Sequence, residues 1–169
     1  MQIRFTETLP EEHANYLFKW RKQVFPVEGE GLVWSGIKWH LTASISGGRP
    51  IAHIGYADFE VLINKNNRQS VVGVGDVVVR PEHQGERIPA KMFEYLHASG
   101  HAKKHSELFV LFCPLRLESY YKQHGYAKFV GAYTFMQGNE QSSSNKFILM
   151  YRGRDLSTVK TIGLECEPW

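Results

Sequence analysis

The sequence is short of the features that mark several large classes of protein. It has two cysteines in 169 residues, Cys113 and Cys166, too few for a disulfide framework and suited to a reducing cytoplasm. No apolar run approaches the roughly 18 residues of a membrane helix, and the start, MQIRFTETLP, lacks the apolar core of a secretory signal. The net charge of +3 is too small to indicate nucleic-acid binding. We therefore expect a cytoplasmic protein that binds neither membranes nor nucleic acids.

The composition is that of one folded domain. Hydrophobic residues make up 43% and charged residues 22% of the chain, the balance of an ordinary globular protein, and no stretch resembles a linker between domains. We expect a single domain over residues 1–169, with an irregular loop or a short helix at 24–36 and a loop at 137–145. Periods of two and of 3.6 residues alternate along the chain. They predict strands near residues 3–5, 37–46, 51–63, 70–79, 107–112, 126–136 and 146–151, and helices near 10–23, 88–102 and 115–124.

These elements predict an α/β fold with a mixed, mostly antiparallel central sheet flanked by helices. The strand at 70–79 is dense in β-branched residues, and Gly73 and Gly75 within it are candidate bulge positions. The helix at 115–124 is followed by Gly125, which suits a left-handed cap.

The segment VVVRPEHQGERIPAKMF (77–93) is the most informative part of the sequence. A strand ends, a turn with proline and glycine follows, and a helix begins. The free N–H groups of a helix start, together with its dipole, form an anion site, and Arg80, Arg87 and Lys91 add positive charge. A plain connection with solvated charges is the alternative interpretation.

Two motifs in this order resemble the GCN5-related N-acetyltransferases (GNATs). Val79, Arg80 and Pro81, then Gln84 and Gly85 before a helix, are similar to the acyl-CoA loop of that family. SYYKQHGY (119–126) resembles the end of the helix after its fifth strand. The resemblance covers essentially the whole chain and implies a GNAT-like fold and acetyl-CoA as cosubstrate. It implies these cofactor-binding residues: Val77, Val78, Val79, Gln84, Gly85, Glu86, Arg87, Ile88, Pro89 and Ala90.

The loop departs from the family where glycines are usual. Arg87 and Pro89 stand at those positions. Pro89 has no N–H, so one donor to a phosphate is missing, while Arg87 can compensate by its charge. We expect cofactor binding to be weakened or re-routed rather than abolished.

A narrower resemblance is to the aminoglycoside 2′-N-acetyltransferase branch, at scattered positions. Gly85, Arg87 and Ala90 match its loop, and the ending Glu167-Pro168-Trp169 matches its acidic residue two before a tryptophan. Phe25, Glu28 and Trp34 match the spacing of its substrate-side loop. The resemblance implies that Glu28, Glu167 and Trp169, with its carboxylate, bind a cationic substrate; the alternative for each is an ordinary surface residue. The acid that this branch carries on strand four falls on Gly75, with Asp76 beside it.

Two catalytic residues follow from this resemblance and from the chemistry of acyl transfer, which needs a neutral amine and a proton for the departing thiolate. Tyr121 matches the general acid of the family; otherwise it is a core tyrosine. Asp76 is the best acid on strand four to draw a proton from the amine, directly or through water. A lone aspartate in a valine strand is costly to bury, although Asp76 could instead face solvent or pair with an arginine.

The remaining reactive residues favour packing over chemistry. His97, His101 and His105 recur every four residues, but Gly100 is expected to end the helix first, so we expect no metal site. Cys113 lacks a histidine base nearby in the sequence and is expected in the core.

Three functions are compatible with these residues. The first is transfer of an acetyl group to a primary amine of a small molecule, such as an aminosugar. The second is acetylation of a protein N-terminus or lysine. The third is an acyl-CoA-binding module without turnover. A homodimer is left open.

Overall fold

The computed structural model describes residues 1–20 and 31–169. The helices are α1 (Glu11–Phe18), α2 (Ile88–Ala98), α3 (Gly100–Lys103) and α4 (Glu118–Lys122), with 3-10 turns η3 (Pro81–His83) and η4 (Leu115–Leu117). The first five strands are β1 (Gln2–Thr6), β2 (Trp39–Ser44), β3 (Pro50–Ile63), β4 (Asn67–Val79) and β5 (Phe109–Pro114). The last five are β6 (Ala127–Lys128), β7 (Ala132–Gln137), β8 (Glu140–Ser142), β9 (Phe147–Arg152) and β10 (Thr161–Leu164).

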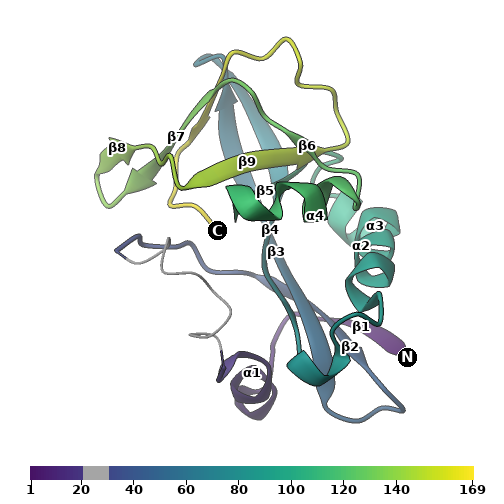
Figure 1. Ribbon diagram of the computed structural model, residues 1–169. Helices are drawn as coiled ribbons and strands as arrows, with labels where there is room; N and C mark the ends of the chain where they lie inside the picture. Colours follow the sequence, from purple (N-terminus) through teal and green to yellow (C-terminus); the bar gives the residue numbers. More distant parts are fainter. Residues whose placement is uncertain (21–30) are drawn as a thin grey trace.

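The described strands form one curled, mixed sheet (Figure 1) in the order β6-β9-β5-β4-β3-β10-β7-β8. β2 pairs with the first half of β3, β10 pairs with its end, and β1 pairs with β2. β4 runs parallel to β5, and β7 parallel to β10; the other described pairs are antiparallel. The predicted α/β fold with a mixed, mostly antiparallel sheet is confirmed.

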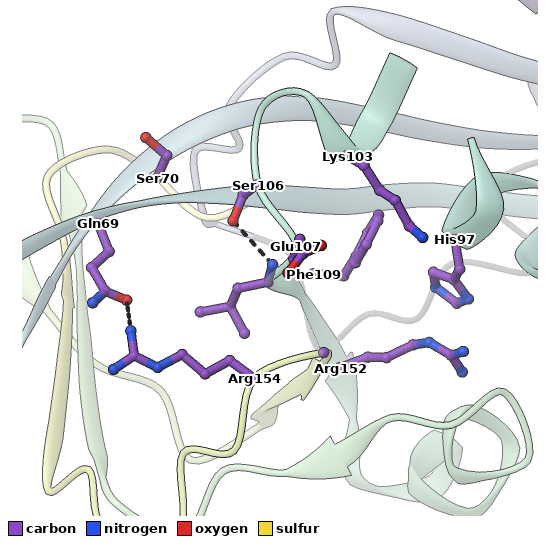
Figure 2. Close-up of a pocket in the computed structure, with 11 residues that line it drawn as sticks. Gln69, Ser70, His97, Lys103, Ser106, Glu107, Phe109, Arg152 and Arg154 are labelled. Atoms are coloured by element: carbon purple, nitrogen blue, oxygen red, sulfur yellow. Dashed lines mark hydrogen bonds between the residues drawn. The ribbon is translucent and has the colours of Figure 1, made fainter. Parts of the chain in front are cut away.

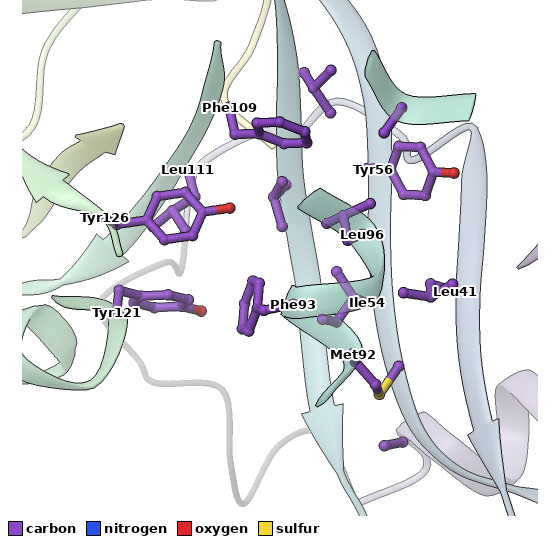
Figure 3. Close-up of a cluster of buried hydrophobic side chains, with 14 of the residues drawn as sticks. Leu41, Ile54, Tyr56, Met92, Phe93, Leu96, Phe109, Leu111, Tyr121 and Tyr126 are labelled. Carbon is purple, nitrogen blue, oxygen red and sulfur yellow. The ribbon is translucent and has the colours of Figure 1, made fainter. Parts of the chain in front are cut away.

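Alternating side chains along the strands build a core on each face of the sheet. One core packs α2 against β2 to β5 through Met92, Phe93 and Leu96, and Figure 3 shows these side chains over Ile54 and Leu41 of the strands. The other core uses alternate residues of β3, β4 and β5 together with residues of β7, β9 and β10, and it buries the indole of Trp169. Among the described residues, no helix is both long and apolar enough to cross a membrane.

Several element boundaries differ from the prediction. The helix predicted at 88–102 is interrupted by Ser99, whose extended backbone ends α2 and whose hydroxyl accepts the N–H of His101 to cap α3. Gly100 therefore begins a helix instead of ending one. The strand predicted at 126–136 is two strands, because the chain leaves β9 after Lys128 and joins β10 from Ala132 onward.

Two short strands were not predicted. β8 lies in the polar segment 137–145, which was predicted to be a loop, and β10 follows the last predicted strand. Each has only a few residues, so hydrophobic periodicity carries little signal there. Pairing with β7 and β3 holds them in place. Gly125 has φ +82° after α4, as the left-handed cap requires.

Candidate active site

A bulge interrupts β4 before the turn that leads to α2. Gly75 pairs with Gly55, and Val78 pairs with His53, so Asp76 and Val77 together stand against Ile54. Asp76 has φ +48°, a conformation that aspartate adopts more readily than most residues. The expectation that Gly73 or Gly75 makes the bulge is wrong, because both glycines lie in regular register with β3.

β4 and β5 separate soon after they meet. Their parallel pairing covers Val72 with Phe109 and Gly73 with Val110, and the register ends there. The last residues of β4, from the bulge to Val79, thus lie beside an opening between the two strands (Figure 1). Val78 is buried, while Val77 and Val79 are half-buried against the α2 core. Main-chain N–H and C=O groups of β4 that have no partner on β5 can therefore bind a ligand here, while the side chains of Val77 and Val79 pack against the α2 core.

The turn after β4 arranges the start of α2. Gly85 and Arg87 both have left-handed backbones, at φ +86° and +56°. Arg87 is the N-cap residue of α2, but its side chain makes no capping hydrogen bond. Pro89 lies in the first turn of the helix. Because the first N–H groups of a helix have no partner within it, those of Ile88 and Ala90 are available to an anion.

The side chains of this turn divide into engaged and exposed groups. Arg80 donates to the carbonyl of Tyr16 at 3.0 Å and pairs with Glu82, so its charge is held against α1. Glu86 pairs with His83 at 3.1 Å, and Gln84 donates to the carbonyl of Val79 at 3.3 Å. The Arg87 side chain is exposed at the helix start. Amide donors and a cation at one place fit a pyrophosphate.

Tyr121 lies on α4, and its ring meets that of Phe93 on α2 edge to face, with ring centres 6.1 Å apart. Its side chain is 8% exposed, and Figure 3 shows its hydroxyl turned toward Phe93 of α2. That hydroxyl makes no hydrogen bond to any described residue. Burial, with smaller contributions from Cys113, Tyr120 and Tyr126, raises the pKa of Tyr121 well above its usual range. The phenol therefore keeps its proton at neutral pH, as a general acid must.

The last residues of the chain return to β4. The indole of Trp169 stacks on Phe59 with ring centres 4.1 Å apart and donates to the carbonyl of Val110 at 3.2 Å. A Cβ on Gly73 would lie 2.3 Å from this indole, and one on Gly75 would lie 3.2 Å from the main-chain carbonyl carbon of Trp169. The two glycines of β4 therefore make room for Trp169.

The same terminal segment is fastened to the segment before β2. Ser35 donates its hydroxyl to the carbonyl of Glu167 at 2.9 Å and its N–H to the carbonyl of Pro168 at 2.7 Å. Trp169 is 5% exposed and Glu167 is half-buried. The structure thus brings Trp169 beside Gly75, next to the bulge of β4, and holds Glu167 against Ser35, whereas Glu28 lies outside the described residues.

A pair of histidines beside the bulge was not predicted from the sequence. Nδ1 of His40 lies 2.9 Å from Nε2 of His53, and Nδ1 of His53 lies 2.8 Å from the main-chain oxygen of Asp76. They are thirteen positions apart in the sequence, and only the register of β2 on β3 makes them diagonal neighbours. The sequence signal that could have indicated this pair is the presence of one histidine in each of two consecutive strands.

The residues set aside in the sequence stay apart from this site. His97 bonds to Tyr126, whereas His101 bonds to Tyr56, and no three His, Cys, Asp or Glu among the described residues could hold a metal. Cys113 is in the core, as predicted, and burial raises its pKa to about 12, so its thiol is a poor nucleophile.

A separate hollow of about 570 Å³ lies at the other end of the sheet, where β5 begins. Figure 2 shows Lys103, Arg152 and Arg154 around it, opposed by Glu107. Arg152 donates to the carbonyl of His124 and Arg154 to Gln69. The hollow contains none of the residues of the turn after β4, so it is distinct from the opening described above.

The comparisons with known proteins bear on this arrangement. A family model described as an acetyltransferase (GNAT) domain matches residues 9–129, most of the chain. The chain belongs to the GNAT acetyltransferase family. The resemblance found in the sequence is thus confirmed at the level of the family. Curated proteins offer no match.

Solved structures share the fold of this acetyltransferase. The GNAT family N-acetyltransferase YhbS from Escherichia coli, in complex with CoA, is 15% identical with a TM-score of 0.59, covering 97% of this chain and 89% of that one. A GNAT family acetyltransferase from Brucella melitensis, in complex with acetyl-CoA, is 21% identical with a TM-score of 0.51, covering 91% and 90%. An acyl-CoA N-acyltransferase from Pseudomonas aeruginosa is 21% identical with a TM-score of 0.56, covering 90% and 100%.

Membership of the family makes the protein an enzyme, an N-acetyltransferase whose acyl donor is acetyl-CoA. The turn after β4 fits that donor. Gly85 and Arg87 have the left-handed backbones that glycine favours, and the N–H groups at the start of α2 come directly after them.

Proposed function

We propose that this acetyltransferase transfers the acetyl group of acetyl-CoA to a primary amine of a small molecule, with aminosugars as the favoured class. The observation that carries the proposal is the fastening of Glu167 and Pro168 to Ser35, with Trp169 seated on Gly73 and Gly75. Residues 167–169, which we call the terminal strap, cover β4 on one side of the bulge. A strap at this place limits the length of acceptor that can lie across β4, which favours a small amine over a peptide in an open groove.

In this proposal the donor is held by β4 and α2. Main-chain groups of Val77, Val78 and Val79 bind the arm of acetyl-CoA. The turn from Gln84 through Glu86 to Arg87, and the first residues of α2, hold the pyrophosphate. The side chain of Ile88 is 3% exposed, so only its N–H serves the cofactor, and Pro89 supplies shape without a donor. In this proposal a single domain, residues 1–169, contains the whole site.

The proposed reaction needs a nucleophilic amine, a proton for the departing thiolate, and negative charge that attracts the cationic acceptor. The amine nitrogen attacks the thioester carbonyl, and the sulfur leaves with the electron pair of the C–S bond. Tyr121 gives its proton to that thiolate. Asp76 and Glu167 attract the ammonium form of the acceptor, and we infer a cytoplasmic location from the two free thiols, Cys113 and Cys166.

The test is acetyl-CoA cleavage with a panel of acceptors, measured as release of the CoA thiol. Aminosugars and diamines are compared with a peptide with a free N-terminus and a peptide with one lysine. We expect kcat/KM at least tenfold higher for a small amine than for either peptide. Preference for a peptide would support protein acetylation instead. Tight acetyl-CoA binding without cleavage in any mixture would support a module without turnover.

A further inference from the structure

His40 and His53 form a short chain of hydrogen bonds that ends on the main chain of the bulge. His53 is 1% exposed, beneath the ring of Phe18 at 5.1 Å. His40 is half-buried and forms the outer end of this series of hydrogen bonds. The bulge is what turns the Asp76 carbonyl to this face, because Asp76 lies outside the ladder between β3 and β4.

The main-chain oxygen fixes which nitrogen of each ring carries hydrogen. A carbonyl oxygen accepts only, so Nδ1 of His53 is the donor in the 2.8 Å bond to Asp76. A charged ring would be costly at so buried a position, so His53 is neutral and its Nε2 accepts. Nδ1 of His40 must then donate across the 2.9 Å contact. A neutral His40 consequently carries its lone pair on Nε2.

The surroundings of His40 suit a base near neutral pH. Burial lowers the pKa of His40, and the negative charge of Asp76 opposes that change. β3 contributes His53 to its surroundings, β1 contributes the uncharged Thr6 opposite it, and α1 contributes Phe18 over His53. Among the described residues, Asp76 is the charged group that acts on His40.

We propose that His40 is the general base for the acceptor amine and that His53 is the residue that positions it. The proposal rests on the proposed function. An N–H bond of the ammonium breaks, its proton goes to Nε2 of His40, and the electron pair left on nitrogen forms the bond to the acetyl carbon. His40 releases that proton to solvent. The second proton that nitrogen loses as the amide forms returns through solvent to Tyr121, which has protonated the thiolate.

The first experiment is the pH profile of kcat/KM with an alkylamine acceptor, which stays protonated between about pH 5 and 8. The wild type should lose activity below the pKa of His40, which lies under its ordinary value of 6.5. His40→Gln keeps a donor for His53. It should lower kcat by about 10²-fold at pH 7.5 and abolish the acid limb, with affinity for acetyl-CoA unchanged.

Two matched variants separate this role from a structural one. Asp76→Asn keeps the bulge, since asparagine tolerates a left-handed backbone, and should move the acid limb to lower pH because the charge that raises the pKa of His40 is gone. His101→Gln alters a histidine on the opposite face of the sheet, bonded to Tyr56, and should leave the profile unchanged. An acid limb that persists in His40→Gln and vanishes in Asp76→Asn would overturn the proposal and make Asp76 the base.

A second measurement needs no turnover. In ¹⁵N-labelled protein at pH 8, both His40 and His53 should carry hydrogen on Nδ1. A neutral His40 ring with hydrogen on Nε2 would have its lone pair on Nδ1, toward His53, and none on Nε2 for the amine, which would overturn the relay. If none of the small amines stimulates cleavage of acetyl-CoA by the wild type, the proposed function fails and the relay with it. An active wild type with a contrary pH profile removes the relay alone.

Discussion

At the residue scale, five non-glycine residues of the described part of the chain have the left-handed backbone that glycine favours, and two of them, Asp76 and Arg87, lie at the candidate site. Arg87 has φ +56° where the family has glycine, and Asp76 has φ +48° in the bulge. A left-handed backbone costs most residues about 1–2 kcal/mol. Each residue therefore places a charge at a position where the backbone alone would be easier to build with glycine: a cation at the helix start, and a carboxylate beside His40.

Replacing Arg87 with glutamate should lower affinity for CoA at least tenfold, about 1.4 kcal/mol. The new charge would lie beside the α2 amides and repel the pyrophosphate. Isothermal calorimetry measures the change. Lys65→Glu reverses a charge at the far end of β4 and should bind CoA as the wild type does. Unchanged affinity in a folded Arg87→Glu protein would show that the pyrophosphate lies elsewhere.

Tyr121→Phe should lower kcat by about 10²-fold while CoA affinity stays near that of the wild type, because only the hydroxyl is removed. Single-turnover rates with saturating acetyl-CoA measure the chemical step. Tyr120→Phe is the control, since it removes the neighbouring hydroxyl from the same helix. Equal rates in the Tyr121 and Tyr120 variants would exclude Tyr121 as the general acid.

At the element scale, the two halves of β4 have different neighbours. Its first half pairs with β3 and β5 and carries glycines on which Trp169 lies. Its second half leaves β5, bulges at Asp76 and ends at the turn before α2. In the proposed function, one strand thus supports the acceptor side, through the terminal strap, and the donor side, through the α2 amides.

Gly73→Ala should displace the indole of Trp169, since the added Cβ would lie 2.3 Å from the ring. We expect a loss of about 1–3 kcal/mol in the free energy of unfolding and a higher KM for the amine, measured by urea unfolding and steady-state kinetics. Gly163→Ala in β10 adds the same methyl at an ordinary contact distance of 3.6 Å and should change little. Equal stability of the two variants would contradict the seating of Trp169 on β4.

Pro89→Gly tests the missing donor of α2. The variant gains an N–H in the first turn of the helix, where it can reach a phosphate, so CoA should bind equally well or more tightly. The unfolded chain gains freedom, which should lower the free energy of unfolding by about 0.4–1 kcal/mol. Calorimetry and urea unfolding give both values. Weaker CoA binding would mean that the proline ring itself shapes the site.

At the scale of the whole molecule, a buried histidine links stability to pH. His97 contacts Tyr126 between α2 and the sheet. Burial, and then the charges of Arg152, His124 and Lys103, lower its pKa to about 3 from 6.5. The unfolded chain binds a proton below pH 6.5 that the folded chain refuses until about pH 3. Stability due to a neutral His97 is therefore present above pH 6.5 and lost as pH falls toward 3.

Between pH 6.5 and 4.5 this effect should remove about 2 kcal/mol from the free energy of unfolding. His97→Gln retains a partner for the Tyr126 hydroxyl and has no titrating ring, so its stability should fall less over the same interval. Urea unfolding of both proteins across this range measures the difference. Parallel curves would show that His97 can be protonated within the fold.

The sequence by itself determined the order of most strands and helices, the turn after β4 and the family. Local signals sufficed there: β-branched runs at 70–79, glycine after α4, and a motif whose residues are contiguous. It also pointed to Tyr121 and Asp76 as candidates, because a motif and an isolated acid in a valine strand are visible without a fold.

Only the tertiary structure decided the bulge at Asp76, the seat of Trp169 and the His40–His53 pair. The bulge depends on how two strands slip past one another, and Trp169 reaches Gly73 from ninety-six positions away along the chain. His40 and His53 meet because β2 pairs with β3 in one register. Contacts between distant segments depend on the free energy of the whole packed chain, so no local pattern in the sequence records them.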